Sequence, residues 1–223
     1  MRATGLVVGF VVLWAFVAPA SAGLVVNADL YGGVPVAPIT DFISDFGGGT
    51  YVNAVTSYSG YIAGASLSDS YGNAGAMTFR LSTGVSTGGV GGGENLLMGD
   101  AFLINMSDTT GVRTVTFSGL DPEALYRLVL YGGAQTSNLS NSDFTLGGVT
   151  KNTGGYNVPI NTNNAIFDNV QPDATGAIVF TWARYDTLGA PFNGFQVVEI
   201  PEPASLGLLA AGGVGLVLRR RRK

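Results

Sequence analysis

Two pairs of neighbouring aspartates are the residues most suited to catalysis. Asp41 with Asp45 and Asp168 with Asp173 are close in sequence, and paired carboxylates hydrolyse glycosides when they lie roughly 5 to 10 Å apart in space. Spacing within loops does not set that distance, so we expect solvated turn acids instead. The pairs therefore predict no catalytic residue.

The chain contains no histidine and no cysteine. The most frequent general base and the thiolate nucleophile are both missing, which excludes Ser-His-Asp and Cys-His chemistry. Disulfides and thiolate metal sites are excluded for the same reason. We expect no enzymatic activity. A carboxylate-dependent hydrolase is the alternative, and it would need polysaccharide hydrolysis that is lost when an aspartate pair is changed.

Oxygen donors for a cation are concentrated in one stretch of the sequence. Asn161-Thr162-Asn163-Asn164 and Asp168-Asn169 supply amide and carboxylate oxygens, which are the ligands that calcium takes. The spacing of an EF-hand loop is absent. We predict no cofactor and no metal-ligating residue, and a bound calcium ion is the alternative.

Four tyrosines lie in a region rich in glycine and serine: Tyr51, Tyr58, Tyr61 and Tyr71. Their side chains are expected to pack in the core. The alternative is a platform on which sugar rings stack, because an aromatic face packs against a pyranose ring. That alternative would make the domain a carbohydrate-binding module.

The formal net charge of −4 conceals an uneven distribution, because five of the eleven basic residues form the C-terminal cluster. Residues 23–200 contain five basic and fourteen acidic residues, a net charge of −9. Such a surface repels phosphate backbones, so nucleic acid is not an expected partner.

The elements that would carry these side chains are short apolar or alternating runs separated by Gly, Asn, Asp and Pro, a pattern typical of strands and turns. The sequence predicts an all-β domain, a β-sandwich of jelly-roll or fibronectin-like type. The predicted strands are 24–30, 76–81, 101–106, 113–117, 126–131, 177–182 and 194–200.

Two connections are predicted as irregular. Residues 82–93 contain six glycines and are expected to form a loop between strands. Their glycine run lacks the Lys-Ser/Thr of a phosphate-binding loop. Residues 186–193 are expected to be a polar turn between two closing strands that end the domain as a pair.

Tyr126 follows Leu120 and Pro122 in a Leu-x-Pro-x-x-x-Tyr pattern. This spacing resembles the tyrosine corner of fibronectin type III and related sandwiches, in which the phenol bonds to backbone upstream. The resemblance implies a structural role for Tyr126.

Residues 1–22 have the features of a secretory signal peptide. A basic residue, Arg2, precedes an apolar run from Leu6 to Val17, and the segment ends in a small-residue motif at Ala20 and Ala22. We predict cleavage by signal peptidase after Ala22. An uncleaved anchor is disfavoured because the apolar run is shorter than the ~20 residues of a spanning helix.

The opposite end has three parts in order. Pro201, Glu202 and Pro203 are followed by an uncharged stretch at 204–218, and then by Arg219, Arg220, Arg221, Arg222 and Lys223. The uncharged stretch predicts a short transmembrane helix, and the basic cluster places the domain on the outer side of the membrane.

This tail resembles the PEP-CTERM sorting signal. The resemblance implies that an exosortase processes the chain in bacteria that make exopolysaccharide and biofilm. The expected location is the cell envelope, the outer surface or the extracellular space. A plain membrane anchor that is never cleaved is the alternative. We thus expect three segments: signal peptide 1–22, β-sandwich 23–200 and sorting tail 201–223.

Overall fold

The computed structural model describes residues 23–31, 51–56, 60–89, 100–108, 111–134, 141–154 and 164–201. These residues form strands and turns with no helix among them, which confirms the all-β prediction. Within these ranges no helix is long and apolar enough to cross a membrane. The predicted signal-peptide and transmembrane helices lie outside the described residues.

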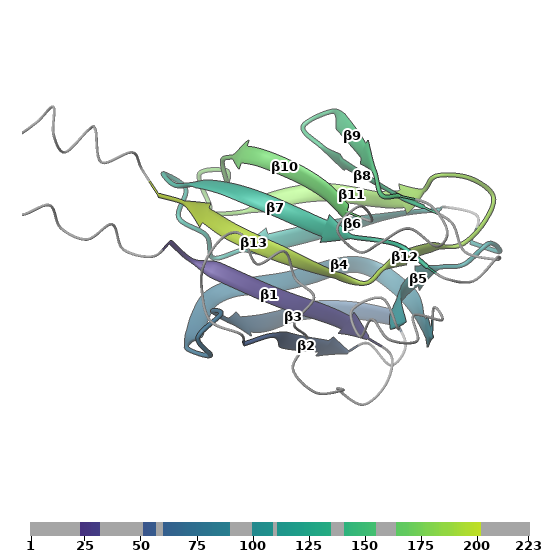
Figure 1. Ribbon diagram of the computed structural model, residues 1–223, viewed down its shortest axis with the longest axis horizontal. Coiled ribbons are helices and arrows are strands. Elements are labelled where there is room, and N and C mark those ends of the chain that lie inside the picture. Colours follow the sequence, from purple (N-terminus) through teal and green to yellow (C-terminus); the bar gives the residue numbers. More distant parts are fainter. Residues whose placement is uncertain are drawn as a thin grey trace, which may run out of the picture. The chain divides into compact units, whose positions relative to one another are not determined.

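One sheet has five strands, and its first and last strands in sequence lie next to each other at its centre (Figure 1). Val26 of β1 pairs with Val197 of β13 in an antiparallel register, whereas β2 runs parallel to β1. The order is β10 (Asn164–Val170), β7 (Leu125–Tyr131), β13 (Gly194–Ile200), β1 (Val25–Tyr31) and β2 (Asn53–Thr56).

The second sheet has eight strands, one of which, β3 (Gly60–Ser68), pairs with β4 off the main order. That order is β12 (Ala190–Phe192), β5 (Asp100–Ile104), β4 (Ala74–Gly89), β6 (Val112–Ser118), β11 (Ile178–Arg184), β8 (Ser142–Leu146) and β9 (Val149–Asn152).

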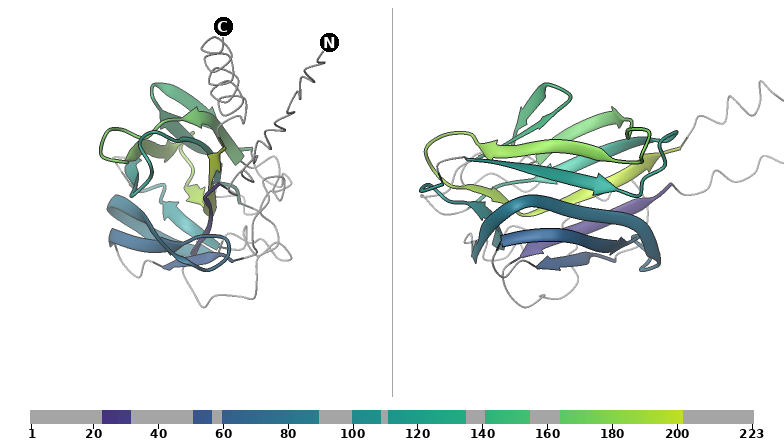
Figure 2. Two further views of the ribbon diagram at one scale, coloured as in Figure 1. Left: turned by 90° about the vertical axis from the view of Figure 1, so that its left-hand side faces the viewer. Right: turned by 180° about the vertical axis from the view of Figure 1, so that it is seen from behind.

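The core lies between the two sheets and is built largely from aromatic side chains. Phe195 of β13 contacts Phe79 of β4 and Phe117 of β6, with ring centroids 5.2 and 4.7 Å apart. In strands such as β6 and β11 alternate residues are buried, as the two-residue period of a strand requires. The end-on view in Figure 2 shows the strands around this shared interior. The arrangement is consistent with a β-sandwich.

The prediction of a loop at 82–93 was wrong for its described part. Strand β4 runs without interruption to Gly89, and residues 90–93 lie outside the described ranges. Ser86 pairs with Leu103 of β5, and Val85 is buried in the core. Pairing with a neighbouring strand has overridden the low strand propensity of glycine.

The polar turn predicted at 186–193 was also wrong in its second half, because Ala190, Pro191 and Phe192 form β12 and are buried. Pro191 is tolerated because β12 is the edge strand of its sheet. The expected closing pair does not form: β11 and β13 belong to different sheets.

The structural role predicted for Tyr126 is confirmed. Its phenol oxygen accepts a hydrogen bond from the backbone N–H of Asp121 at 3.0 Å, and its ring is buried in the core. Burial raises the pKa of the Tyr126 hydroxyl above its ordinary value. The phenol therefore fixes the turn that leads into β7.

Candidate functional site

Two of the four tyrosines are exposed, so the expected core packing was wrong for them. Tyr51 lies two residues before the start of β2 and is 46 % exposed, and Tyr71, in the turn between β3 and β4, is 62 % exposed. The side chains of Tyr58 and Tyr61 lie outside the described residues. The sequence alternative of an aromatic platform is therefore tenable for Tyr51 and Tyr71, which we call the tyrosine pair.

Backbone hydrogen bonds hold the two tyrosines close together. The N–H of Tyr51 donates to the carbonyl of Ser70 at 2.9 Å, which ties the Tyr51 segment to the residue just before Tyr71. The side chain of Asn27 also donates to the Tyr51 carbonyl, at 3.3 Å. These bonds limit the conformational freedom that a ligand would otherwise have to remove on binding.

Gly72 provides the surface on which the Tyr51 ring rests. Its φ is +85°, and a Cβ placed on it would lie 3.3 Å from Cδ2 of Tyr51. A side chain here would be strained by the backbone and would crowd the ring. Glycine therefore lets the Tyr51 ring approach the backbone beside Tyr71.

Asp69 closes the turn that carries Tyr71. Its Oδ1 accepts hydrogen bonds from the N–H groups of Tyr71 and Asn73, and its Oδ2 accepts one from the Asn73 side chain, each at 2.9 Å. These bonds, led by the one from the Asn73 side chain, lower the pKa of Asp69. The carboxylate is therefore ionised at neutral pH and lies beside the tyrosine pair.

The buried side chain of Asn53 holds together the strands next to the tyrosine pair. Asn53 of β2 donates to the carbonyls of Asn27 and Ser68 at 2.9 and 2.8 Å, and its Oδ1 accepts from the Ser68 N–H at 2.8 Å. One side chain thus joins β1, β2 and β3. The sequence analysis did not predict the role of Asn53. It also did not predict the turn formed by Asp69, Gly72 and Asn73, although these residue types between two strand-like runs are a recognised turn signal.

Of the two aspartate pairs considered for catalysis, the structure describes Asp168 with Asp173; the turn position expected for Asp168 was wrong, because it lies in β10, whereas Asp173 closes a turn. Asp168 of β10 forms an ion pair with Arg127 of β7, whereas Asp173 accepts bonds from the N–H groups of Thr175 and Ala177 at 2.8 and 3.0 Å. Each carboxylate thus has its own partners. Asp41 and Asp45 lie outside the described residues.

The stretch considered for calcium is only partly described. Asn164 and Asn169 belong to β10, and residues 161–163 lie outside the described ranges. Among the described residues no group of three or more His, Cys, Asp or Glu side chains could hold a metal ion.

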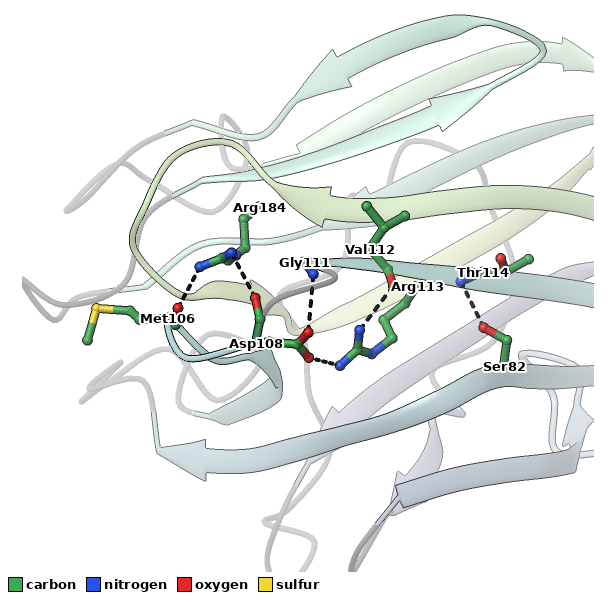
Figure 3. Close-up of polar contacts among 8 residues, drawn as sticks. All are labelled: Ser82, Met106, Asp108, Gly111, Val112, Arg113, Thr114 and Arg184. Atoms are coloured by element: carbon green, nitrogen blue, oxygen red, sulfur yellow. Dashed lines mark hydrogen bonds and ion pairs between the residues drawn. The ribbon is translucent and has the colours of Figure 1, made fainter.

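A second polar cluster joins the β5–β6 connection to β11 (Figure 3). Arg184 donates to the carbonyls of Met106 and Asp108, both at 2.9 Å, and Asp108 forms an ion pair with Arg113. Asp108 also accepts from the N–H of Gly111 at 3.2 Å. Both arginines bind residues of the β5–β6 connection, so the cluster has a structural role.

The two ends of the described domain meet where the central strands β1 and β13 begin and end, respectively. Leu24 donates to Oε2 of Glu199 at 3.1 Å, and Glu199 donates to the Leu24 carbonyl at 2.7 Å. A Cβ on Gly23 would lie 2.6 Å from the Glu199 carbonyl oxygen, so this position has room only for glycine. Pro201 follows β13 directly and is exposed.

The match to a known sequence family starts at this point of the chain. The family model of the PEP-CTERM protein-sorting motif matches residues 199–222. The chain carries a PEP-CTERM motif. The match confirms the resemblance seen in the tail, and its first two residues are also the last two residues of β13.

The PEP-CTERM motif marks a secreted protein that is sorted to the cell surface and implies processing by exosortase. Of its predicted sorting residues, Pro201 is described, whereas Glu202, Pro203 and the cluster Arg219, Arg220, Arg221 and Arg222 are not. The signal-peptide residues Ala20 and Ala22 also lie outside the described ranges. Their predicted roles stay predictions.

One solved structure similar to this PEP-CTERM protein is that of TmCBM61 in complex with β-1,4-galactotriose. It is 13 % identical, the match covers 56 % of this chain and 88 % of that one, and the TM-score is 0.29. A TM-score this low does not establish a shared fold. No curated protein matches the sequence.

Proposed function

We propose that this chain is an exported, non-enzymatic protein of the cell envelope or extracellular matrix, which exosortase sorts through the PEP-CTERM motif. The observation that carries the proposal is the motif at residues 199–222, which begins within the last strand of the domain. Signal peptidase acts on the N-terminal segment, the C-terminal helix holds the precursor in the membrane, and the mature protein associates with exopolysaccharide in a biofilm.

A non-catalytic role is supported by residue types and by how the acids are used. The sequence has no histidine or cysteine to act as base or nucleophile. Asp108 and Asp168 pair with arginines, and Asp69 and Asp173 close turns. The proposal includes no cofactor.

Sorting is tested by measuring the intact mass of the protein from envelope and medium fractions of a host that contains an exosortase. A form that starts at Gly23 and ends near Pro203 is expected. Replacing Pro201, Glu202 and Pro203 by alanine should leave a full-length tail in the membrane. Glu123→Ala, an exposed acid elsewhere in the domain, is the matched control. A full tail in the unchanged protein would support plain anchoring instead.

The tyrosine pair favours a second candidate function, that of a carbohydrate-binding module. Exposed aromatic rings on a fixed backbone suit the flat faces of sugar rings. Tyr71→Ala should abolish glycan binding by the full chain. Tyr185→Ala is the matched control, because Tyr185 is 60 % exposed but follows β11. Equal binding by both variants would reject the tyrosine pair as the site.

A further inference from the structure

We infer that the tyrosine pair selects an uncharged glycan and discriminates against acidic ones such as polyuronates. This inference rests on the second candidate function, carbohydrate binding. It is carried by the position and hydrogen bonding of Asp69, whose carboxylate accepts from the backbone of Tyr71 itself.

The first step is the charge beside the rings. The Asp69 carboxylate accepts its hydrogen bonds from its own turn, from Tyr71 and Asn73, and none of these donors is a cation. Exposed charges act over about 10 Å at 0.1 M salt. A carboxylate on a sugar stacked on Tyr71 would lie within that range and would be repelled.

The second step is the remaining hydrogen-bonding capacity of Asp69. An ionised carboxylate offers about four acceptor positions and no donor. The turn itself takes up most of these positions, through Tyr71 and Asn73 and through an interaction with the Gly72 N–H, so Asp69 can only accept and has no donor to offer a ligand. A sugar hydroxyl beside Asp69 can act as a donor, whereas a uronate carboxylate supplies only acceptors at the oxidised position.

The third step is the charge of the whole domain. Residues 23–200 have a net charge of −9, so the long-range field also opposes the approach of a polyanion. Local and global electrostatics therefore act in the same direction. An uncharged glycan pays neither penalty and keeps the stacking energy of the rings.

The experiment compares matched glycans on the full-length protein. A β-linked mannan oligosaccharide and the β-linked mannuronate of equal length differ only by oxidation of the primary alcohol. Homogalacturonan before and after reduction of its carboxylates gives a second pair, and a broad glycan array extends the set. At about 0.02 M salt the uncharged member should bind at least about tenfold more tightly.

Two further measurements assign the preference to charge. Asp69→Asn keeps the size of the side chain, and the Asn73 amide can turn over to preserve their bond. This variant, and separately an increase to about 0.5 M salt, should reduce the tenfold preference to about threefold or less. Tyr71→Ala should lose the uncharged glycan, and Tyr185→Ala should not.

The outcomes separate the two levels of the proposal. Equal or tighter binding of the acidic member at low salt overturns the charge selection and leaves carbohydrate binding standing. A preference that neither salt nor Asp69→Asn alters also overturns it, because charge would not be the cause. Failure to bind any glycan on the array, by protein with an unchanged circular dichroism spectrum, rejects carbohydrate binding itself. Exosortase sorting is independent of all three.

Discussion

The backbone N–H of Leu24 lies 3.1 Å from Oε2 of Glu199, and the Glu199 N–H lies 2.7 Å from the Leu24 carbonyl. The backbone bond extends the β1–β13 pairing by one residue beyond Val25 and Val198, and the Glu199 side chain accepts the other N–H of this pair. Glu199 is also the first residue of the PEP-CTERM match. The start of the sorting motif is therefore part of the folded sheet.

Replacing Glu199 by alanine should destabilise this end of the sheet. The side chain supplies a charge-assisted acceptor in a partly exposed position, so its loss should cost about 1 kcal/mol. For a domain of this size the thermal midpoint should fall by about 2 to 4 °C. Glu123→Ala, with its side chain exposed, should leave the midpoint unchanged; an equal fall in both would contradict a specific role for Glu199.

The Tyr126 phenol provides a second stability test. Tyr126→Phe keeps the buried ring but removes the acceptor of the Asp121 N–H, which should cost about 1 kcal/mol in the free energy of unfolding. Tyr185→Phe removes a hydroxyl from an exposed ring and should have no effect. Chemical denaturation of both variants measures the difference, and a neutral Tyr126→Phe would show that the corner bond contributes nothing.

Ser142 joins two elements in the interior. Its hydroxyl accepts from Nε1 of Trp182 at 3.1 Å and donates to the carbonyl of Pro191. Ser142→Ala would leave a buried indole N–H and a buried carbonyl without this partner, a cost of about 2 to 4 kcal/mol. Ser66→Ala, on the exposed side of β3, is the control. A fall in the free energy of unfolding below about 0.5 kcal/mol for Ser142→Ala would show that these two hydrogen bonds contribute little to stability.

Asp69 and Asp173 predict how stability depends on pH. Hydrogen bonds lower the pKa of both carboxyls in the folded state, from the Asn73 side chain for Asp69 and from the Thr175 hydroxyl for Asp173. Their stabilisation is therefore present above the unfolded pKa and is lost as pH falls through the lower folded pKa. The window lies below about pH 4.

Thermal melts between about pH 5 and pH 2 measure this dependence. Asp69→Asn combined with Asp173→Asn should flatten the loss of stability on acidification, because these groups then no longer titrate. Asp186→Asn is the comparison for an exposed acid. If the thermal midpoint of the double variant fell with acidification as steeply as that of the unchanged protein, other carboxyls would be responsible for the loss of stability.

The strands with clear patterns were predictable, and the reasons for the misses are local. Val115 and Phe117 alternate with threonines on β6, so period and propensity agree there. The end of β4 was missed because its glycines resemble a loop, and its strand state depends on pairing with β5. Strand β10 is interrupted by a bulge after Phe167, with Asn169 at φ 56°, which obscures its alternation.

The site was predictable in composition but not in exposure. For tyrosines among glycines the sequence left two alternatives, packing in the core or a platform for sugar rings, and the exposure of each ring decides between them. Tyr126 is buried and Tyr71 exposed, yet both follow turn residues in sequence. What separates them is the strand face on which Tyr126 falls and the Asp69 turn that holds Tyr71 outside the sheet. The sorting motif was predictable because its signal is local in sequence.

The central pairing of β1 with β13 also bears on how the protein is made. Neither strand has its full set of partners until the last residues of the domain leave the ribosome, because 169 positions separate Asn27 from Gln196. Contacts this distant in sequence make folding slow. The nascent polypeptide would thus stay unfolded long enough to thread through a secretion channel, and the sheet would close only on the far side.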